Sequence, residues 1–214
     1  MTSKLILYLI LISLQGCCTT VPKPLGDLDT AIHQVIIVSP VKNGSCRASL
    51  STWQRQGSSW RRELLASAMI GKNGLAAANA KREGDGKTPS GIYPLETAFG
   101  YAPSIDTGLS YRQASTDDFW VDDVTSVQYN EWVKGPLPAG SFERMKRFDN
   151  LYQYGIVIGY NRHPVVRGAG SAIFIHVWRR YDSPTSGCVA LNQRNIRRLL
   201  HWLKQQYQPV IILE

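Results

Sequence analysis

The sequence is poor in cysteine, with four in 214 residues, at positions 17, 18, 46 and 188. Their spacing does not include the CxxC pairs that hold structural zinc, so the pattern predicts no such site. The sequence also lacks internal repeats, low-complexity tracts and any helix-turn-helix, zinc-finger or RNA-binding signature. These absences argue against a nucleic-acid partner.

Acidic residues are in the minority, with 16 against 24 lysines and arginines, which gives a formal charge of +8. The basic residues are dispersed as pairs such as Arg61-Arg62 and Arg179-Arg180, and they form no continuous block. We interpret them as a solvated surface. In an exported protein, a positive balance would suit an anionic partner such as a cell wall or a membrane surface.

Long hydrophobic runs are absent except for ten largely apolar residues, 5–14, which follow Lys4. A membrane-spanning helix needs about 20 such residues, whereas this length suits the core of a signal peptide. Leu14-Gln15-Gly16-Cys17 resembles a bacterial lipoprotein box. The pattern predicts a signal peptide at 1–16, a lipid on Cys17, a tether at 17–30 and a place on the periplasmic face of a bacterial membrane. The alternative is an ordinary secretory signal cut nearby, which would leave a soluble periplasmic or secreted protein.

A lipid on Cys17 would leave three cysteines, an odd number for an oxidising compartment. One thiol is then expected to remain free, and Cys188 is the candidate with a chemical reason to do so. Cys18 and Cys46 can form a disulfide in this arrangement.

Short strands dominate the rest of the sequence. Strands are expected at 35–38, 154–160, 172–178 and 210–213, and a hairpin at 48–55 and 59–64 turns at Gln56-Gly57. Residues 143–147 suggest a helical turn. A longer helix is expected after Asn192, a favourable N-cap, because Ile196, Leu199, Leu200 and Leu203 share one helical face. The chain is therefore predicted to form one mainly-β domain, 31–214, with long loops and one substantial carboxyl-terminal helix.

The segment from residue 171 to 191 contains the pair with the clearest chemistry. In a strand, Phe174, His176 and Trp178 point to one side, and a loop through Gly187 returns the chain to Cys188. An imidazole beside a thiol can remove its proton, and N–H groups near Gly187 can face a developing oxyanion. Read without context, a lone cysteine is more often a small buried hydrophobe and a lone histidine a satisfied core residue.

Several motifs resemble the catalytic domain of L,D-transpeptidases of the YkuD type. His176, Thr185, Gly187 and Cys188 match the family's histidine followed by Ser/Thr-His-Gly-Cys. Similar segments lie upstream in the same order, at 71–75, 81–91, 120–123, 129–130, 159–161 and 170–176, so the resemblance runs from about residue 35 to the carboxyl terminus. It implies a YkuD-like β-sandwich or barrel. The departures are Ser186, where better-known members carry a second histidine, and Ala190, where they carry Asn or Arg.

The resemblance implies acyl transfer on peptidoglycan stem peptides in cell-wall biogenesis and cell shape. Cys188 would be the nucleophile and His176 its base, Gly187 would support the oxyanion, and the Val177 carbonyl would orient the imidazole. No metal or organic cofactor is required. The residues expected to bind substrate are Trp120, Asp123, Tyr160, Trp178 and Ser186. The alternative roles are a loop cap for Asp123 and core packing for the aromatic residues.

Two other functions remain compatible with the sequence. With water as acceptor, the same site would make a cell-wall hydrolase or amidase. Without chemistry, the chain would be a lipid-anchored module that binds peptidoglycan.

Overall fold

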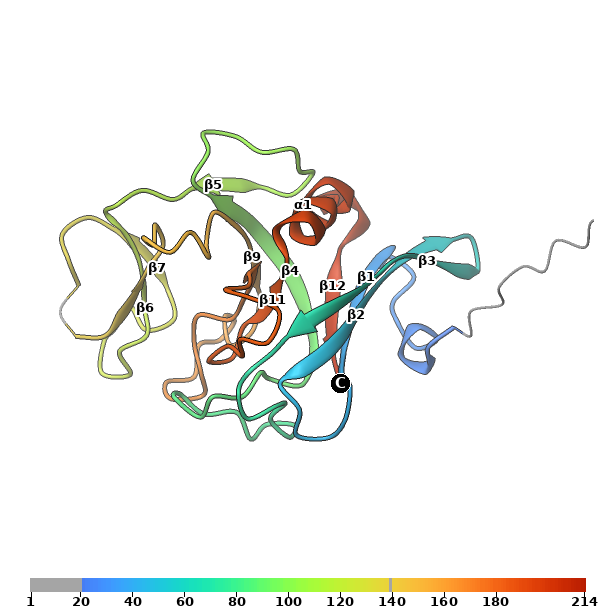
Figure 1. Cartoon of the computed structure of the whole chain (residues 1–214), viewed down its shortest axis with the longest axis horizontal. Helices are drawn as coiled ribbons and strands as arrows, with labels where there is room; N and C mark the ends of the chain where they lie inside the picture. Colours follow the sequence, from blue (N-terminus) through green and yellow to red (C-terminus); the bar gives the residue numbers. More distant parts are fainter. Residues whose placement is uncertain (1–20, 139) are drawn as a thin grey trace, which may run out of the picture.

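The computed structural model describes residues 21–138 and 140–214, of which 38% lie in strands and 8% in helices. The larger sheet contains β1 (Gln34–Pro40), β2 (Arg47–Gln56), β3 (Ser59–Met69), β4 (Gly91–Gly100), β5 (Tyr111–Gln113), β9 (Tyr154–Ile158), β10 (Phe174–Val177), β11 (Val189–Leu191) and β12 (Val210–Leu213). Their order is β12-β1-β2-β3-β11-β10-β9-β4-β5. Because β12 also pairs with β4, the sheet closes into a barrel with β5 at its edge (Figure 1). The predicted mainly-β, YkuD-like fold is confirmed.

The alternation of side chains along β1 explains how both faces of the sheet are covered. Ile36 and Val38 point into the main core, whereas Val35 and Ile37 belong to a second cluster on the opposite face. Leu25, from the 3-10 helix η1 (Lys23–Leu25), is buried in that second cluster. Part of the predicted tether therefore packs against the sheet. The predicted signal peptide, Cys17 and Cys18 lie outside the described residues.

The carboxyl-terminal helix forms where the sequence predicts it. α1 spans Gln193–Trp202, and the side chain of Asn192 caps it by accepting a 2.8 Å hydrogen bond from the backbone N–H of Asn195. Its apolar face enters the main core with residues of β9 and β10. A short 3-10 helix, η2 (Gln205–Tyr207), then leads to β12, the predicted closing strand. No helix among the described residues is long and apolar enough to cross a membrane.

A smaller sheet, ordered β7-β6-β8, contains β6 (Asp118–Val121), β7 (Trp132–Lys134) and β8 (Phe142–Arg144). Figure 1 shows β6 and β7 at the end of the molecule opposite the β2–β3 hairpin. The predicted helical turn at 143–147 is wrong, because Phe142–Arg144 pairs with β6 as a strand and residues 145–147 form no helix. The edge-to-face contact of Phe142 with Phe119, at 5.1 Å between ring centroids, helps to fix that pairing.

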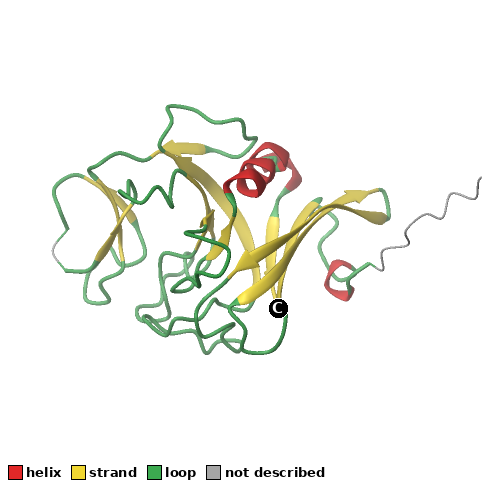
Figure 2. Cartoon of the chain, viewed as in Figure 1, coloured by secondary structure: helices red, strands yellow, loops and turns green. Residues whose placement is uncertain are grey.

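Long loops connect the strands of the barrel (Figure 2). They include residues 70–90, between β3 and β4, and residues 159–173, between β9 and β10. Both loops carry segments that the sequence analysis singled out. They meet around the start of β10, where the candidate site lies.

Candidate functional site

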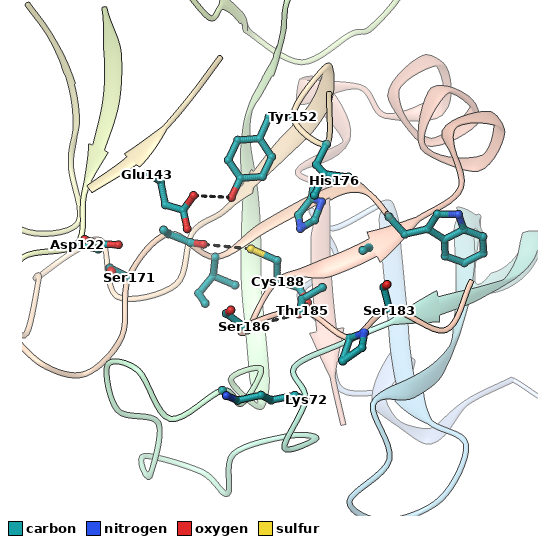
Figure 3. Close-up of a pocket in the computed structure, with 18 of the residues that line it drawn as sticks. Lys72, Asp122, Glu143, Tyr152, Ser171, His176, Ser183, Thr185, Ser186 and Cys188 are labelled. Carbon is teal, nitrogen blue, oxygen red and sulfur yellow. Dashed lines mark hydrogen bonds between the residues drawn. The ribbon is translucent and has the colours of Figure 1, made fainter. Parts of the chain in front are cut away.

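His176 and Cys188 lie side by side because β10 and β11 run parallel. His176 stands opposite Ala190, and Ile175 stands opposite Val189. Continuing this register places Cys188 beside Phe174. Phe174 lies two residues before His176 on the same strand, so the side chains of Cys188 and His176 point to the same face of the sheet. Figure 3 shows the imidazole and the sulfur in one cavity. The spatial arrangement expected from the alternation of the strand is therefore present.

The sulfur of Cys188 is held by the backbone that leads into β10. Its thiol donates a 3.2 Å hydrogen bond to the carbonyl oxygen of Ala172, and the N–H of Phe174 donates to the sulfur at 3.4 Å. Cys188 is a free thiol and only 8% exposed. It packs on one side against an aromatic cluster that includes Phe174 and lines the cavity on the other. The sulfur is thus buried but open to the cavity.

The imidazole of His176 is fixed by two contacts. Its Nδ1 lies 2.8 Å from the carbonyl oxygen of Val177, and since a carbonyl only accepts, Nδ1 carries the proton. The neutral ring therefore leaves Nε2 unprotonated as a base. The ring of Tyr152 packs edge-on against the imidazole, with centroids 5.2 Å apart.

Burial keeps both reactive groups uncharged. Desolvation raises the pKa of the Cys188 thiol to about 12, against the lowering effect of the Phe174 N–H. Desolvation lowers the pKa of His176 to about 4, although the hydrogen bond to Val177 works in the opposite direction. At neutral pH the resting pair is therefore a thiol and a neutral imidazole.

The turn before Cys188 depends on Gly187 and two threonines. Gly187 has φ +158°, and a Cβ there would lie 3.0 Å from the carbonyl oxygen of Lys87, so a side chain would push the two loops apart. Thr88 donates a 2.7 Å hydrogen bond to the Gly187 carbonyl, and Thr185 accepts the Gly187 N–H at 3.1 Å. The Gly187 N–H therefore already has a partner. The N–H of Cys188 has no acceptor among the described residues, so of the two N–H groups expected to face an oxyanion it is the one left free.

The cavity in front of the sulfur has a volume of about 450 Å³ and a strongly polar lining (Figure 3). The charged side chains on its wall are Lys72, Lys81, Arg147, Arg179, Glu83, Asp122 and Glu143. Positive and negative groups thus share one small space next to the Cys188 sulfur. Such a lining suits a ligand that carries both amines and carboxylates.

The three carboxylates do not all have strong partners. Glu143 bonds Arg147 at 3.0 Å, but burial raises its pKa, and burial likewise raises the pKa of Asp122. One carboxylate oxygen of Asp122 is buried with no hydrogen-bond partner among the described residues. Glu83 accepts hydrogen bonds from the hydroxyls of Tyr129 and Ser171.

The residues expected to bind substrate divide into two groups. Trp178 and Ser186 line the cavity. Trp120, Asp123 and Tyr160 are not among the described residues that line it. Trp120 is 2% exposed in the core, Asp123 caps a loop by accepting hydrogen bonds from Thr125, and the Tyr160 hydroxyl is bound to a backbone carbonyl. These three residues therefore have structural roles.

Sequence reasoning missed several residues of the cavity wall. Lys81 and Glu83 lie in the segment 81–91 that carries the family resemblance, so their position was a usable signal. Lys81 is 5% exposed and forms a 2.7 Å ion pair with Asp85. Tyr152 and Glu143 gave no local signal, because only the folded chain brings Tyr152 against His176 and Glu143 against Tyr152.

The chain matches one protein family over most of its length. The sequence model of the family described as YkuD, L,D-transpeptidase catalytic domain, matches residues 34–212. No curated protein matches the chain. Among solved structures, Bdellovibrio bacteriovorus Bd1075 is similar at 17% identity and a TM-score of 0.47, over 86% of this chain and 48% of that one. The helical cell shape determining protein Pgp2 from Campylobacter jejuni is similar at 14% identity and a TM-score of 0.46, over 85% of this chain and 47% of that one. The chain spans about half the length of these two structures.

Proposed function

This chain belongs to the YkuD family of L,D-transpeptidase catalytic domains, and we propose that it transfers peptidoglycan stem peptides through a thioester on Cys188. The observation that carries the proposal is the shared cavity of a free thiol and an imidazole whose Nε2 is unprotonated. The acyl donor would be a tetrapeptide stem, cut between diaminopimelate and the terminal D-Ala. The acceptor would be an amine.

In the first half of the reaction, the Cys188 sulfur attacks the carbonyl carbon at the L-centre of diaminopimelate. The thiol proton moves to Nε2 of His176, and the carbonyl oxygen becomes an oxyanion near the Cys188 N–H. When the bond to D-Ala breaks, the imidazolium gives its proton to the leaving amine. A thioester and free D-Ala remain.

In the second half, the acceptor amine attacks the thioester and loses a proton to His176. The carbon–sulfur bond breaks, and the proton returns to the sulfur as the new amide forms. Because the resting thiol and imidazole are both neutral, each half of the reaction begins and ends without a separated charge pair. This supports a cycle in which ionisation occurs only with substrate bound.

The carboxylates of the cavity support an amine-bearing ligand. Burial removes part of the hydration of the Asp122 and Glu143 carboxylates, so a substrate ammonium nearby would offset part of that loss. Lys72 and Arg179 also line the cavity and would suit the carboxylates of a stem peptide. Attack by a neutral amine needs a local base, and His176 supplies one.

The test is product analysis with the purified protein, a disaccharide-tetrapeptide and a second D-amino acid. The proposal expects the exchange product, in which the new D-amino acid replaces D-Ala. C188A should abolish exchange, whereas C46A, which removes the other described cysteine, should leave it within about twofold. Accumulation of the shortened tripeptide stem alone would instead identify a hydrolase. Binding of the stem with neither product would identify a non-catalytic module.

The cellular setting follows from the proposed substrate. Peptidoglycan lies outside the cytoplasm, so we expect the mature chain to act there, in cell-wall biogenesis and cell shape. Attachment through a lipid on Cys17 would place the cavity near the membrane. Mass analysis of the amino-terminal peptide from the native host tests this point, since a diacylglyceryl adduct on Cys17 is expected and an unmodified cysteine would contradict it.

A further inference from the structure

Ala172, the residue whose carbonyl holds the thiol, has an unusual backbone. Its φ is +52°, in the left-handed region that residues with a Cβ rarely adopt. Such a conformation is disfavoured for alanine and persists only when neighbouring groups enforce it. Ala172 also lines the cavity. The strained residue is thus in direct contact with the nucleophile.

Asn130 supplies the contact that enforces this conformation. Its side-chain oxygen accepts hydrogen bonds from the Ala172 N–H at 3.1 Å and from the indole of Trp120 at 2.9 Å. Its amide nitrogen donates to the carbonyl oxygens of Asn161 at 2.6 Å and Tyr160 at 3.3 Å. Asn130 is 1% exposed, so its amide is shielded from solvent. The amide is anchored from three sides and presents its oxygen to Ala172.

The same segment is held at a second point. The N–H of Gly170 donates to the Tyr129 hydroxyl at 3.1 Å, and the Ser171 hydroxyl donates to Glu83 at 2.7 Å. Residues 170–172 are therefore fixed before β10 begins. Their fixed path aims the Ala172 carbonyl and the Phe174 N–H at the sulfur of Cys188.

We propose that Asn130 is a positioning residue for the nucleophile: it holds Ala172 in the left-handed conformation, and the carbonyl of Ala172 in turn holds the Cys188 thiol in its resting place. A thiol hydrogen can rotate about the carbon–sulfur bond while the sulfur stays where it is. The proton can then turn from Ala172 to Nε2 of His176 when substrate arrives. The consequence for turnover rests on the proposed function, but the hydrogen bond of the resting thiol does not.

The first test observes that hydrogen bond directly. The Raman S–H stretching band of Cys188 is assigned as the band lost in C188A, and a hydrogen-bonded thiol gives a lower frequency than a free one. In N130A, Ala172 is expected to relax and the band to move toward the free frequency, while turnover falls about tenfold. Q34A is the matched control, because Gln34 is another buried amide that donates to two oxygens and accepts one backbone N–H, outside the cavity lining. Q34A should leave the band in place.

The second test asks whether Asn130 acts through the backbone of Ala172. Glycine adopts a positive φ without strain, so A172G should make the site less dependent on Asn130. We expect loss of Asn130 to slow turnover about tenfold in the wild-type background, but less than about threefold in the A172G background. Thermal denaturation confirms folding, and if N130A alone does not fold, A172G is compared with N130A/A172G.

Two results would overturn the proposal. One is a folded N130A that has the wild-type S–H band together with unchanged turnover. Where N130A does not fold, the corresponding result is a loss of turnover of about tenfold or more in N130A/A172G relative to A172G. The other is an equal loss of turnover on removing Asn130 in both backgrounds. If the band moves as expected but no variant, nor the wild type, transfers stems, the positioning role stands and the proposed function fails.

Discussion

Removing the Thr88 hydroxyl should destabilise the loop that carries Cys188. Thr88 is fully buried, and its hydroxyl donates to the Gly187 carbonyl at 2.7 Å and accepts the Gly71 N–H at 2.9 Å. Thr88→Val keeps the shape of the side chain but removes both bonds. A Gly187 carbonyl and a Gly71 N–H are then left without partners in a buried place.

The magnitude follows from those two groups. Leaving one buried polar group unsatisfied costs about 1–3 kcal/mol, so T88V should lower the free energy of unfolding by about 3 kcal/mol. Thr88→Ser is the matched control, because it keeps the hydroxyl and loses one methyl group, worth about 1 kcal/mol. Since Gly187 precedes Cys188, T88V should also slow acylation at least about tenfold, whereas T88S should slow it far less.

Urea denaturation at pH 7 measures the free energy of unfolding, and assays quenched at fixed times measure the rate of thioester formation. A T88V protein within about 1 kcal/mol of the wild type would refute the reasoning. Equal damage by T88S would also refute it, because the methyl group and not the hydroxyl would then be the important contact.

Three further predictions concern the imidazole and the helix. His176→Ala should slow acylation by about 10²–10⁴-fold, as expected for loss of a general base. The control is His201→Ala, at an exposed histidine, which should change the acylation rate less than about twofold. Similar rates for the two variants would contradict the role of His176 as the base. The pKa of His176 is lowered from 6.5 to about 4 in the folded chain. As pH falls, the unfolded chain therefore binds a proton at this histidine before the folded chain does. The free energy of unfolding should drop by an amount on the order of 3 kcal/mol between pH 6.5 and pH 4. Urea denaturation at pH 7 and pH 4.5 should therefore show a smaller loss for H176Q than for the wild type, and equal losses would contradict the pKa. Asn192→Ala removes the helix cap and should lower the free energy of unfolding by about 1 kcal/mol in the same assay. N192S keeps a capping oxygen and should be close to the wild type in stability. The acylation rate should be unchanged in both variants.

Features encoded by neighbouring residues were predictable from the sequence. Gly57 turns the β2–β3 hairpin with a positive φ, and Asn192 starts α1, because each acts within a few residues of itself. The side-by-side placement of His176 and Cys188 was also within reach. It needed only the two-residue period of a strand and a short loop that returns the chain to the neighbouring strand.

Features that depend on distant contacts were not predictable. The strand Phe142–Arg144 reads locally as a helical turn, and only pairing with β6 makes it extended. Trp120 and Tyr160 lie in segments that carry the family resemblance, and both were expected to bind substrate. Both instead serve the network of Asn130, which lies 42 residues from Ala172 in sequence. The charge state of the site was equally hidden, because it follows from burial of the thiol and imidazole in three dimensions.

The covalent step is the central claim, and intact-protein mass spectrometry tests it most directly. Incubation with a tetrapeptide stem should add the mass of the stem minus D-Ala, and digestion should place the adduct on the peptide that contains Cys188. C188A should show no adduct, and C46A should show it in full. A folded, stem-bound protein without an adduct, or an adduct on Cys46, would contradict the account.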